Sequence, residues 1–330
     1  MLDNQIEIGG YFEFCLPNYE QFPYPQALNY ISARSAFFDL LNQNNIKKIW
    51  MPKFICDAMI DPLLILDIEI QYYDINEEFY PVLPNHLKED EYLLYVNYFG
   101  LCTAIQQKLI NIYPNDQIIF DHSQAFFVKP FDCFATIYSL RKFLPVAEGG
   151  LLISKALTKP NYIARNVEMM IQQYHHCFVR RLSSASEAYD IFKNNEMLLN
   201  DCIPKKISGM TKEIMECLNY SSIQMQRLDN FKFLHSQLAD INHLNIDIAD
   251  IESPLTYPLL LKSSISKELI GNNIYTPTYW LDSLQRLDVD SFEYKLVTGI
   301  THIVCDQRYS QKQMQFQVDK IKEYFNEHRR

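Results

Sequence analysis

The sequence predicts an α/β fold: a mostly parallel central sheet flanked by helices, with a smaller C-terminal α+β domain. Six short runs rich in β-branched and aromatic residues fill the first half, and stretches able to form helices separate the first four of them. Such alternation predicts parallel strands covered on both faces. With 330 residues and 48% hydrophobic content, the chain is long enough for one large domain and a smaller one.

The predicted elements of the large domain follow in a regular order. Helices are expected within 34–45, where Ser35 lies near the start, and within 103–113, where Thr103 is a candidate N-cap. Residues 155–181 also read as helical, apart from Pro160. Strands are expected within 46–52, 68–75, 91–100, 117–124, 133–140 and 150–154.

The character of the chain changes near residue 205. A long helical pattern covers 210–241, a β-rich segment covers 253–264, and residues 272–280 lead toward a terminal helix at 310–330. We therefore expect a large domain over 1–205, with an N-terminal arm, and a small domain over 206–330.

Composition narrows the class of protein. The net charge of −10 comes from 40 acidic and 30 basic residues with no basic block longer than two, which argues against a nucleic-acid-binding surface. Eight scattered cysteines, without a CxxC pair or zinc-like spacing, indicate reduced thiols and no metal site. No window approaches the ~18 apolar residues of a membrane span, so a cytoplasmic protein without membrane contact is expected.

Polar residues follow three of the predicted strands. Asn97, Asp121 and Ser139 each stand at the end of an apolar run. In open α/β sheets, ligands bind at the carboxyl ends of the strands. We therefore expect these residues to share a site.

Lys142 follows Ser139 in an apolar setting, with Leu140, Phe143 and Leu144 beside it. Removing an ammonium group from water costs several kcal/mol unless the group is paired or used. The alternative is a lysine that extends from a loop into solvent.

A possible anion cradle lies at the start of the helix at 34–45. Arg34, Ser35 and Ala36 stand where backbone N–H groups could bind a phosphate ester, together with Ser139. A serine at a helix start can also be only an N-cap, and Asp121 could likewise cap the following turn. Taken together, a buried acid, a cradle and a desolvated lysine match the needs of pyridoxal 5'-phosphate: a Schiff base, a protonated ring nitrogen and an anchored ester.

Several segments in order resemble the DegT/DnrJ/EryC1/StrS sugar aminotransferases, which have the aspartate-aminotransferase type of pyridoxal phosphate fold, fold type I. "SLRKFLPVAEGGLL" is similar to the catalytic "SxxxxKxLxxxxGG" region, and "FDHSQAF" to "EDxAQA". The further matches are "IGGYFEF" to the opening arm, "ARSAFFDLL" to the phosphate-loop helix, "MPKFICDAM" to "VPxxTxxA", "VNYFG" to "VHLFG", "IYTPTYW" to the substrate-side strand and "DQRYSQKQM" to the closing helix.

The resemblance implies a role for each matched residue. Lys142 would form the internal aldimine, a Schiff base, and act as general acid and base, and Asp121 would be the pyridinium partner. Gln124 would lie near the phenolic oxygen of the ring. The phosphate would be bound by Ser139 and by backbone amides of Ser35 and Ala36, and Arg34 could reach either the phosphate or the acidic donor.

Some positions depart from the family pattern. Cys56 stands where many relatives have an aromatic residue stacked on the cofactor ring, although Phe54 is close. "KKISGMTKEIM" lacks the usual "NxR" of the cross-subunit phosphate contact, which leaves Lys206, Ser208 and Gly209 as candidates. The serine and lysine of the catalytic region are three residues apart, which is typical of a divergent, shorter subgroup.

Three histidines and an aromatic pair also stand close to the candidate segments. His122 should face away from the ring, because successive side chains of a strand alternate. His175 and His176 are expected to be surface or packing residues. Tyr279 and Trp280 could line a sugar site or belong to the core.

The resemblance implies a homodimeric aminotransferase that moves an amino group, usually from glutamate, to a keto group of a nucleotide-linked sugar, for lipopolysaccharide or other polysaccharide biosynthesis. Lys142 is retained where dehydrating relatives have histidine, so transamination is preferred over dehydration. Two alternatives remain open: a pyridoxal phosphate enzyme with a non-nucleotide substrate, and a catalytically decayed binding or assembly module. Glutamate and glutamine both remain open as donor.

Overall fold

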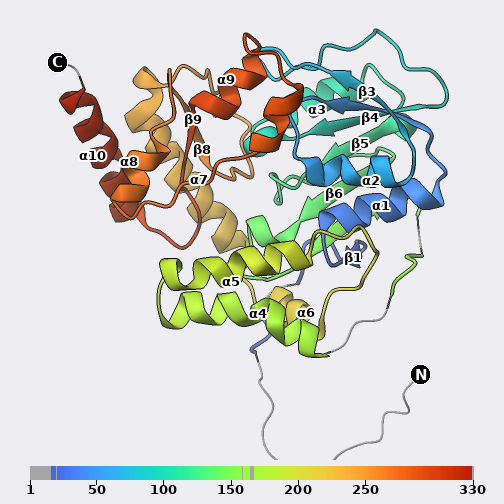
Figure 1. The fold of residues 1–330 in the computed structure, drawn as a ribbon, viewed down its shortest axis with the longest axis horizontal. Helices are drawn as coiled ribbons and strands as arrows, with labels where there is room; N and C mark the ends of the chain where they lie inside the picture. The colour runs from blue at the N-terminus through green and yellow to red at the C-terminus, as the bar shows by residue number, and fades with distance from the viewer. Residues whose placement is uncertain (1–15, 20, 158, 164–166, 329–330) are drawn as a thin grey trace, which may run out of the picture.

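A computed structural model describes residues 16–19, 21–157, 159–163 and 167–328. The predicted opening arm at 8–14 lies outside these residues. The described chain forms a seven-stranded sheet with helices on both faces and a separate two-stranded sheet near the C-terminus (Figure 1). No helix within the described ranges is long and apolar enough to cross a membrane.

The large sheet is mostly parallel, as predicted. Its strand order is β1-β7-β6-β5-β4-β2-β3; β6, β5, β4, β2 and β3 run parallel, whereas β7 runs antiparallel to both of its neighbours. The strands are β1 Leu28–Tyr30, β2 Lys48–Pro52, β3 Glu69–Tyr73, β4 Glu91–Val96, β5 Ile118–Asp121, β6 Ala135–Ser139 and β7 Gly150–Ser154. All six predicted strands of the first half are confirmed, and β1 is an addition.

The helices of the first half are α1 Ala33–Gln43, α2 Asp61–Ile65 and α3 Thr103–Ile110. The first prediction placed the start of α1 at Arg34, one residue late. The prediction for 155–181 was wrong over its first part, because 159–163 form no helix and the helix α4 spans Val167–Leu182. A second helix, α5 Ala185–Leu198, then folds back on α4.

The C-terminal part has helices on one side of a small antiparallel sheet. The single helical pattern at 210–241 divides into α6 Gly209–Glu216 and α7 Tyr220–Leu238. The 272–280 segment contains no strand, so the resemblance to a substrate-side strand was wrong as to conformation. The remaining elements are β8 Tyr257–Leu260, α8 Ser266–Gly271, α9 Phe292–Gly299, β9 Ile300–Ile303 and α10 Gln311–Glu327.

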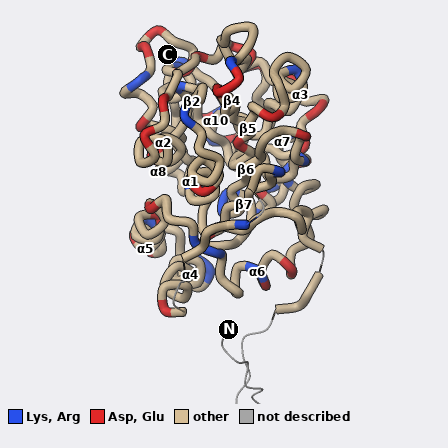
Figure 2. The backbone as a smooth tube through the Cα atoms, turned by 90° about the vertical axis from the view of Figure 1, so that its right-hand side faces the viewer, with Lys and Arg blue, Asp and Glu red and all other residues tan. Residues whose placement is uncertain are grey.

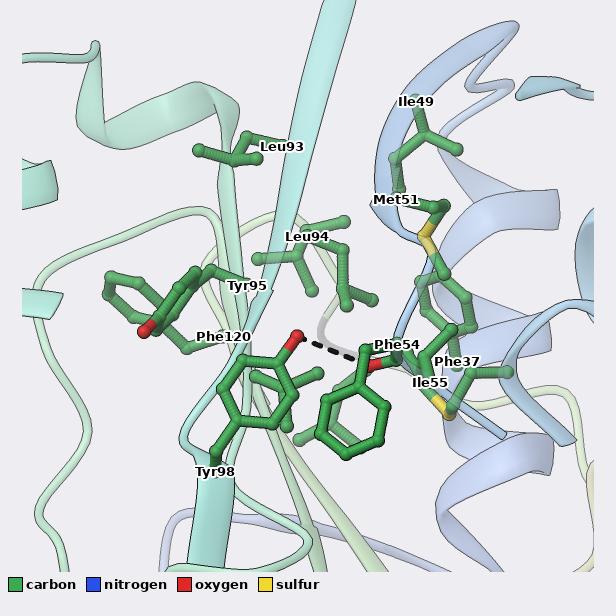
Figure 3. Packing of buried hydrophobic residues seen from close by; sticks show 14 of the residues in the cluster. Phe37, Ile49, Met51, Phe54, Ile55, Leu93, Leu94, Tyr95, Tyr98 and Phe120 are labelled. Atoms are coloured by element: carbon green, nitrogen blue, oxygen red, sulfur yellow. Dashed lines mark hydrogen bonds between the residues drawn. The ribbon is translucent and has the colours of Figure 1, made fainter. Parts of the chain in front are cut away.

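A continuous apolar core lies under the large sheet and reaches the C-terminal part. Ile49 and Met51 of β2 belong to this core together with Leu93 and Leu94 of β4, which point to opposite sides of their strand (Figure 3). At the end of these strands the rings of Phe54 and Tyr98 stack at 5.4 Å, and the Tyr98 hydroxyl donates a 3.2 Å hydrogen bond to the Phe54 carbonyl (Figure 3). This aromatic cluster forms the floor beneath the carboxyl ends of the strands.

Charged residues are dispersed over the fold. Figure 2 shows basic and acidic positions interspersed along the chain, without a continuous basic stripe. The distribution agrees with the modest negative charge of the sequence and gives local charge clusters more weight than any global field.

Candidate active site

The carboxyl ends of β5 and β6 and the N-terminus of α1 border one cavity of about 160 Å³. It is lined by residues from the carboxyl ends of the sheet strands, from the start of α1, from α5 and the residues just after it, and from the C-terminal part. Six of the residues predicted for the site line this cavity: Arg34, Cys56, Asp121, Gln124, Ser139 and Lys142. Ser35 and Ala36 do not line it.

Asp121 is the last residue of β5 and is only 4% exposed. One carboxylate oxygen accepts a 2.7 Å hydrogen bond from the N–H of Ser123. That bond fixes the side chain at the strand end and leaves acceptor capacity on the carboxylate for a group inside the cavity.

Gln124 follows Asp121 on the same turn and is fully buried. Its side-chain oxygen accepts a 2.8 Å hydrogen bond from the N–H of Phe99, which determines which end of the amide faces inward. Its Nε2 has no hydrogen-bond partner among the described residues. Leaving a buried donor unpaired costs about 1–3 kcal/mol, so this nitrogen calls for an acceptor in the cavity.

Ser139 ends β6, and Lys142 follows within the short 3₁₀ helix η4, Leu140–Lys142. The Ser139 hydroxyl makes no hydrogen bond to the described residues, and Lys142 makes no ion pair with them. Lys142 is half-buried, and its Nζ lies 6.0 Å from the ring centroid of Tyr279. Lys142 thus lines the cavity, whereas its sequence neighbours Leu140 and Phe143 are buried.

The loop that carries Lys142 is held from the C-terminal part. Arg227 of α7, 2% exposed, lies 4.5 Å from the ring centroid of Phe143 and donates a long 3.4 Å hydrogen bond to the Lys142 carbonyl. Gln307 donates a 2.7 Å hydrogen bond to the Phe143 carbonyl. The backbone at the lysine is therefore anchored, while its side chain can move.

The start of α1 corrects the expectation for Ser35 and Ala36. Ser32 is the N-cap: its hydroxyl accepts from the Ser35 N–H at 3.1 Å, and its carbonyl accepts from the Ala36 N–H at 3.1 Å. The helix thus uses both amides itself. The cavity is lined instead by Ser32, Ala33 and Arg34, and the N–H groups of the first two helical residues have no partner within the helix.

Gly150 lets this helix end come close to the sheet. A Cβ atom at Gly150 would lie 2.2 Å from the Ser32 carbonyl carbon and 2.3 Å from the Ala33 nitrogen. Gly149, with φ of +127°, turns the chain into β7 just before it. The glycine pair behind the lysine is therefore required by the packing of α1 on β7.

Two arginines connect the cavity to α5 and the residues after it. Arg141 pairs with Glu196 of α5, and Arg34 donates to the Asn200 carbonyl and lies 3.7 Å from Asp61. The Nε atoms of both arginines are buried without a partner among the described residues. Sequence reasoning missed Arg141, Glu196 and Asn200, because their pairing joins segments about 55 to 166 residues apart.

Cys56 and Trp280 complete another part of the wall. Burial raises the pKa of the Cys56 thiol to about 11, although the charge of Lys142 opposes the shift. The thiol is therefore protonated at neutral pH and acts as a small neutral group. Trp280 is 8% exposed and comes from the C-terminal part.

Other predicted candidates lie elsewhere. His122 does not line the cavity, as expected; its Nε2 lies 3.0 Å from the Gln106 side-chain oxygen. His176 packs against Phe192 of α5, at 5.5 Å between ring centroids. Ser208 caps α6 and donates its N–H to Glu148, so it does not reach the cavity within this chain. Lys206 and Gly209 are also absent from the cavity wall.

Comparison with solved structures identifies the class of fold. The chain has the fold of the type I aminotransferases, and it matches sugar aminotransferases of the DegT/DnrJ/EryC1/StrS group over about 90% of its length. No family model and no curated protein sequence matches it.

Three solved structures illustrate the match. A DegT DnrJ EryC1 StrS aminotransferase from Brucella abortus superposes with a TM-score of 0.63 at 11% identity, covering 90% of this chain and 85% of that one. PseC from Helicobacter pylori, an aminotransferase involved in the biosynthesis of pseudoaminic acid, gives 0.59 at 15% identity, with coverage of 91% and 87%. NtdA from Bacillus subtilis, with bound cofactor PMP, gives 0.58 at 12% identity, with coverage of 90% and 72%.

Proposed function

We propose that the protein is a pyridoxal phosphate-dependent aminotransferase that moves an amino group, with glutamate as donor, to a keto group of a nucleotide-linked sugar. The observation that carries the proposal is the gathering of Lys142, Asp121, Gln124 and Ser139 around one cavity at the N-terminus of α1. The likeness in fold to sugar aminotransferases supports the same conclusion.

The polar groups of the cavity fit this coenzyme. Asp121 offers a carboxylate, Gln124 offers an Nε2 donor that lacks a partner among the described residues, and the start of α1 offers N–H groups for a phosphate. When bound, the coenzyme supplies an aldehyde that reacts with amines and a ring that accepts electrons.

Asp121 holds a proton at the pyridine nitrogen in this proposal. A carboxylate next to a pyridinium favours the protonated ring, and the Ser123 N–H keeps the carboxylate at the strand end. Gln124 would donate from Nε2 to the phenolic oxygen, which would satisfy a buried donor that lacks a partner among the described residues.

Lys142 supplies the reactive amine. Its Nζ makes no ion pair with the described residues, so no carboxylate neutralises it or competes for its protons. After the amino donor takes its place, Nζ carries a proton to and from the substrate carbon. Because Arg227 and Gln307 hold the backbone of this loop, the transfer needs motion of the side chain only.

In this proposal the N–H groups of Ala33 and Arg34 and the Ser139 hydroxyl would hold the phosphate. Glu196 of α5 and Asn200, just after this helix, line one side of the cavity and would limit the access of water. The guanidinium groups near the mouth suit the carboxylates of an acidic donor or the phosphates of a nucleotide.

The rest of the proposal concerns the substrate and the assembly. We also propose that the protein acts as a cytoplasmic homodimer in polysaccharide biosynthesis, with a coenzyme-binding domain over 1–205 and a small domain over 206–330. The two alternatives predict different reactions. An enzyme with a non-nucleotide substrate would react with the amino donor but not with a keto-sugar nucleotide, and a decayed module would react with neither.

The half-reaction with the donor tests the proposal. Glutamate added to the coenzyme-loaded protein should convert the coenzyme from its aldehyde form to its amine form, with loss of the visible absorbance, and a keto-sugar nucleotide should restore it. Asp121→Asn should strongly slow both steps. A loaded protein that neither glutamate nor glutamine converts would contradict the proposal and favour the module.

A further inference from the structure

The wall around the predicted coenzyme site lacks an aromatic residue at the position where the sequence comparison places one. That position is Cys56, whose side chain offers no ring face. Among the described residues that line the cavity, Trp280 is the one aromatic residue. It reaches the cavity from the C-terminal part, more than 200 positions further along the chain.

The backbone at Trp280 is held in an unfavourable conformation. Its φ of 58° and ψ of 41° are left-handed, a region that is unfavourable for a bulky non-glycine residue. Ser283 stabilises the turn, since its N–H and its hydroxyl donate to the Trp280 carbonyl at 3.0 and 2.7 Å. Backbone outliers of this kind gather at ligand sites, where the structure around them maintains the strain.

The indole is also oriented by its neighbours. Its ring centroid lies 4.6 Å from that of Phe54 and 5.7 Å from that of Tyr98, both in edge arrangements, and 6.4 Å from that of Phe99, nearly parallel. Tyr98 is in turn stacked on Phe54 (Figure 3). Packing on three rings fixes the indole plane while part of it borders the cavity.

We propose that Trp280 supplies the aromatic surface against which the pyridine ring packs, in place of the residue that Cys56 cannot provide. The inference rests on the proposed function, because it presumes that this cavity holds pyridoxal phosphate. Trp280 is a positioning residue in this role: it restrains the tilt of the ring while Asp121, Gln124 and Lys142 make the polar contacts. Aromatic ring pairs prefer offset or edge-to-face arrangements over a face-to-face sandwich, and they contribute more than the apolar area that they bury.

Tryptophan fluorescence gives a direct test, because the chain has only two tryptophans. Trp50 lies on β2, away from the cavity wall, and donates from its indole to Glu91 at 3.0 Å. In Trp50→Phe the emission reports Trp280 alone, and in Trp280→Phe it reports Trp50 alone. Energy transfer from a tryptophan to the bound coenzyme falls with the sixth power of the distance between them. Saturating pyridoxal phosphate should therefore quench the emission of Trp50→Phe much more strongly than that of Trp280→Phe.

The affinity for pyridoxal phosphate provides a second readout. Trp280→Phe keeps a ring face and should bind the coenzyme nearly as tightly as the parent, whereas Trp280→Leu should bind about two- to tenfold more weakly. Equal quenching in the two single-tryptophan variants, or equal affinity of the Phe and Leu variants with a raised KM for the sugar acceptor, would overturn the inference. If the parent develops no visible band with the coenzyme, the proposed function itself fails, and that outcome is distinct.

Discussion

Arg227 should be far more important for stability than its neighbour Arg308, although both are arginines of the C-terminal part. Arg227 is 2% exposed, and it donates to the Gln307 side chain at 2.7 Å and to the carbonyls of Pro254 and Leu255 at 3.1 and 3.2 Å. Burial also lowers the pKa of its guanidinium. Replacing it by leucine removes the donor from the Pro254 carbonyl and from the Gln307 side-chain oxygen, and leaves the Leu255 carbonyl with the weak contact from the Cys305 thiol.

The magnitude follows from the contacts that are lost. Each buried acceptor left without a partner costs about 1–3 kcal/mol. The leucine variant no longer buries a charged guanidinium, which offsets part of this cost. Arg227→Leu should therefore lower the free energy of unfolding by about 3–5 kcal/mol. For 330 residues, an unfolding entropy of about 2.1 cal/mol/K per residue makes each kcal/mol worth roughly 1.5 °C in Tm. The expected fall in Tm is therefore about 4–7 °C.

Arg308→Leu is the matched control. The Arg308 side chain is 59% exposed and donates to both carboxylate oxygens of Asp306, at 2.9 and 2.7 Å. Because water can reach this pair and replace its hydrogen bonds, Arg308→Leu should lose less stability than Arg227→Leu. Thermal unfolding followed by circular dichroism should separate the two variants clearly. Equal losses in Tm would refute the argument that Arg227 joins the lysine loop to the C-terminal part.

Two further predictions concern pH and the approach of α1 to the sheet. Burial lowers the pKa of His302 from 6.5 to about 3. Below about pH 6.5 only the unfolded chain takes up this proton, so the free energy of unfolding falls as the pH falls from 6.5 toward 3. At about pH 5 the loss is ~2 kcal/mol. Denaturant titrations at about pH 7.5 and 5 give the free energy of unfolding at each pH, and the loss between them should be about 2 kcal/mol smaller in His302→Asn than in the parent. His86 is exposed, so His86→Gln is the control and should lose as much as the parent. An equal loss in all three proteins would contradict this account. Gly150→Ala should displace Ser32 and Ala33 and weaken the binding of pyridoxal phosphate at least about tenfold, since one lost charge-assisted hydrogen bond already accounts for about 1.5–3 kcal/mol. Gly271→Ala is the control and should bind the coenzyme normally, because nothing lies within 4 Å of the new Cβ there. Unchanged affinity in Gly150→Ala would exclude the close approach of α1 as a requirement.

The sequence was most informative where local pattern determines structure. Apolar runs of four to six residues became the strands, and the polar residues directly after them, Asp121 and Ser139, lie at the strand ends where the cavity forms. Lys142 could be singled out because an amine beside Leu140 and Phe143 contradicts ordinary surface patterning. These inferences need only the strand period and the rule for ligands in open sheets.

The sequence was less informative where distant segments meet. Ser35 was expected to donate its N–H to a phosphate, but it donates to the hydroxyl of Ser32. Ser32 and Ser35 are three residues apart, each can be an N-cap, and the sequence pattern alone does not choose between them. The contact of Arg34 with Asn200 and that of Arg227 with Lys142 depend on the tertiary fold. The left-handed conformation of Trp280 could not be anticipated either, since tryptophan has no preference for that region.

The most direct test of the central claim is the visible absorbance of the protein loaded with pyridoxal phosphate. The account predicts that the parent shows an absorbance band at longer wavelength than the free coenzyme, and that Lys142→Ala shows no such band. Lys205 pairs with Asp201 outside the cavity, so Lys205→Ala should keep the band. A band that persists without the amine at position 142 would contradict it.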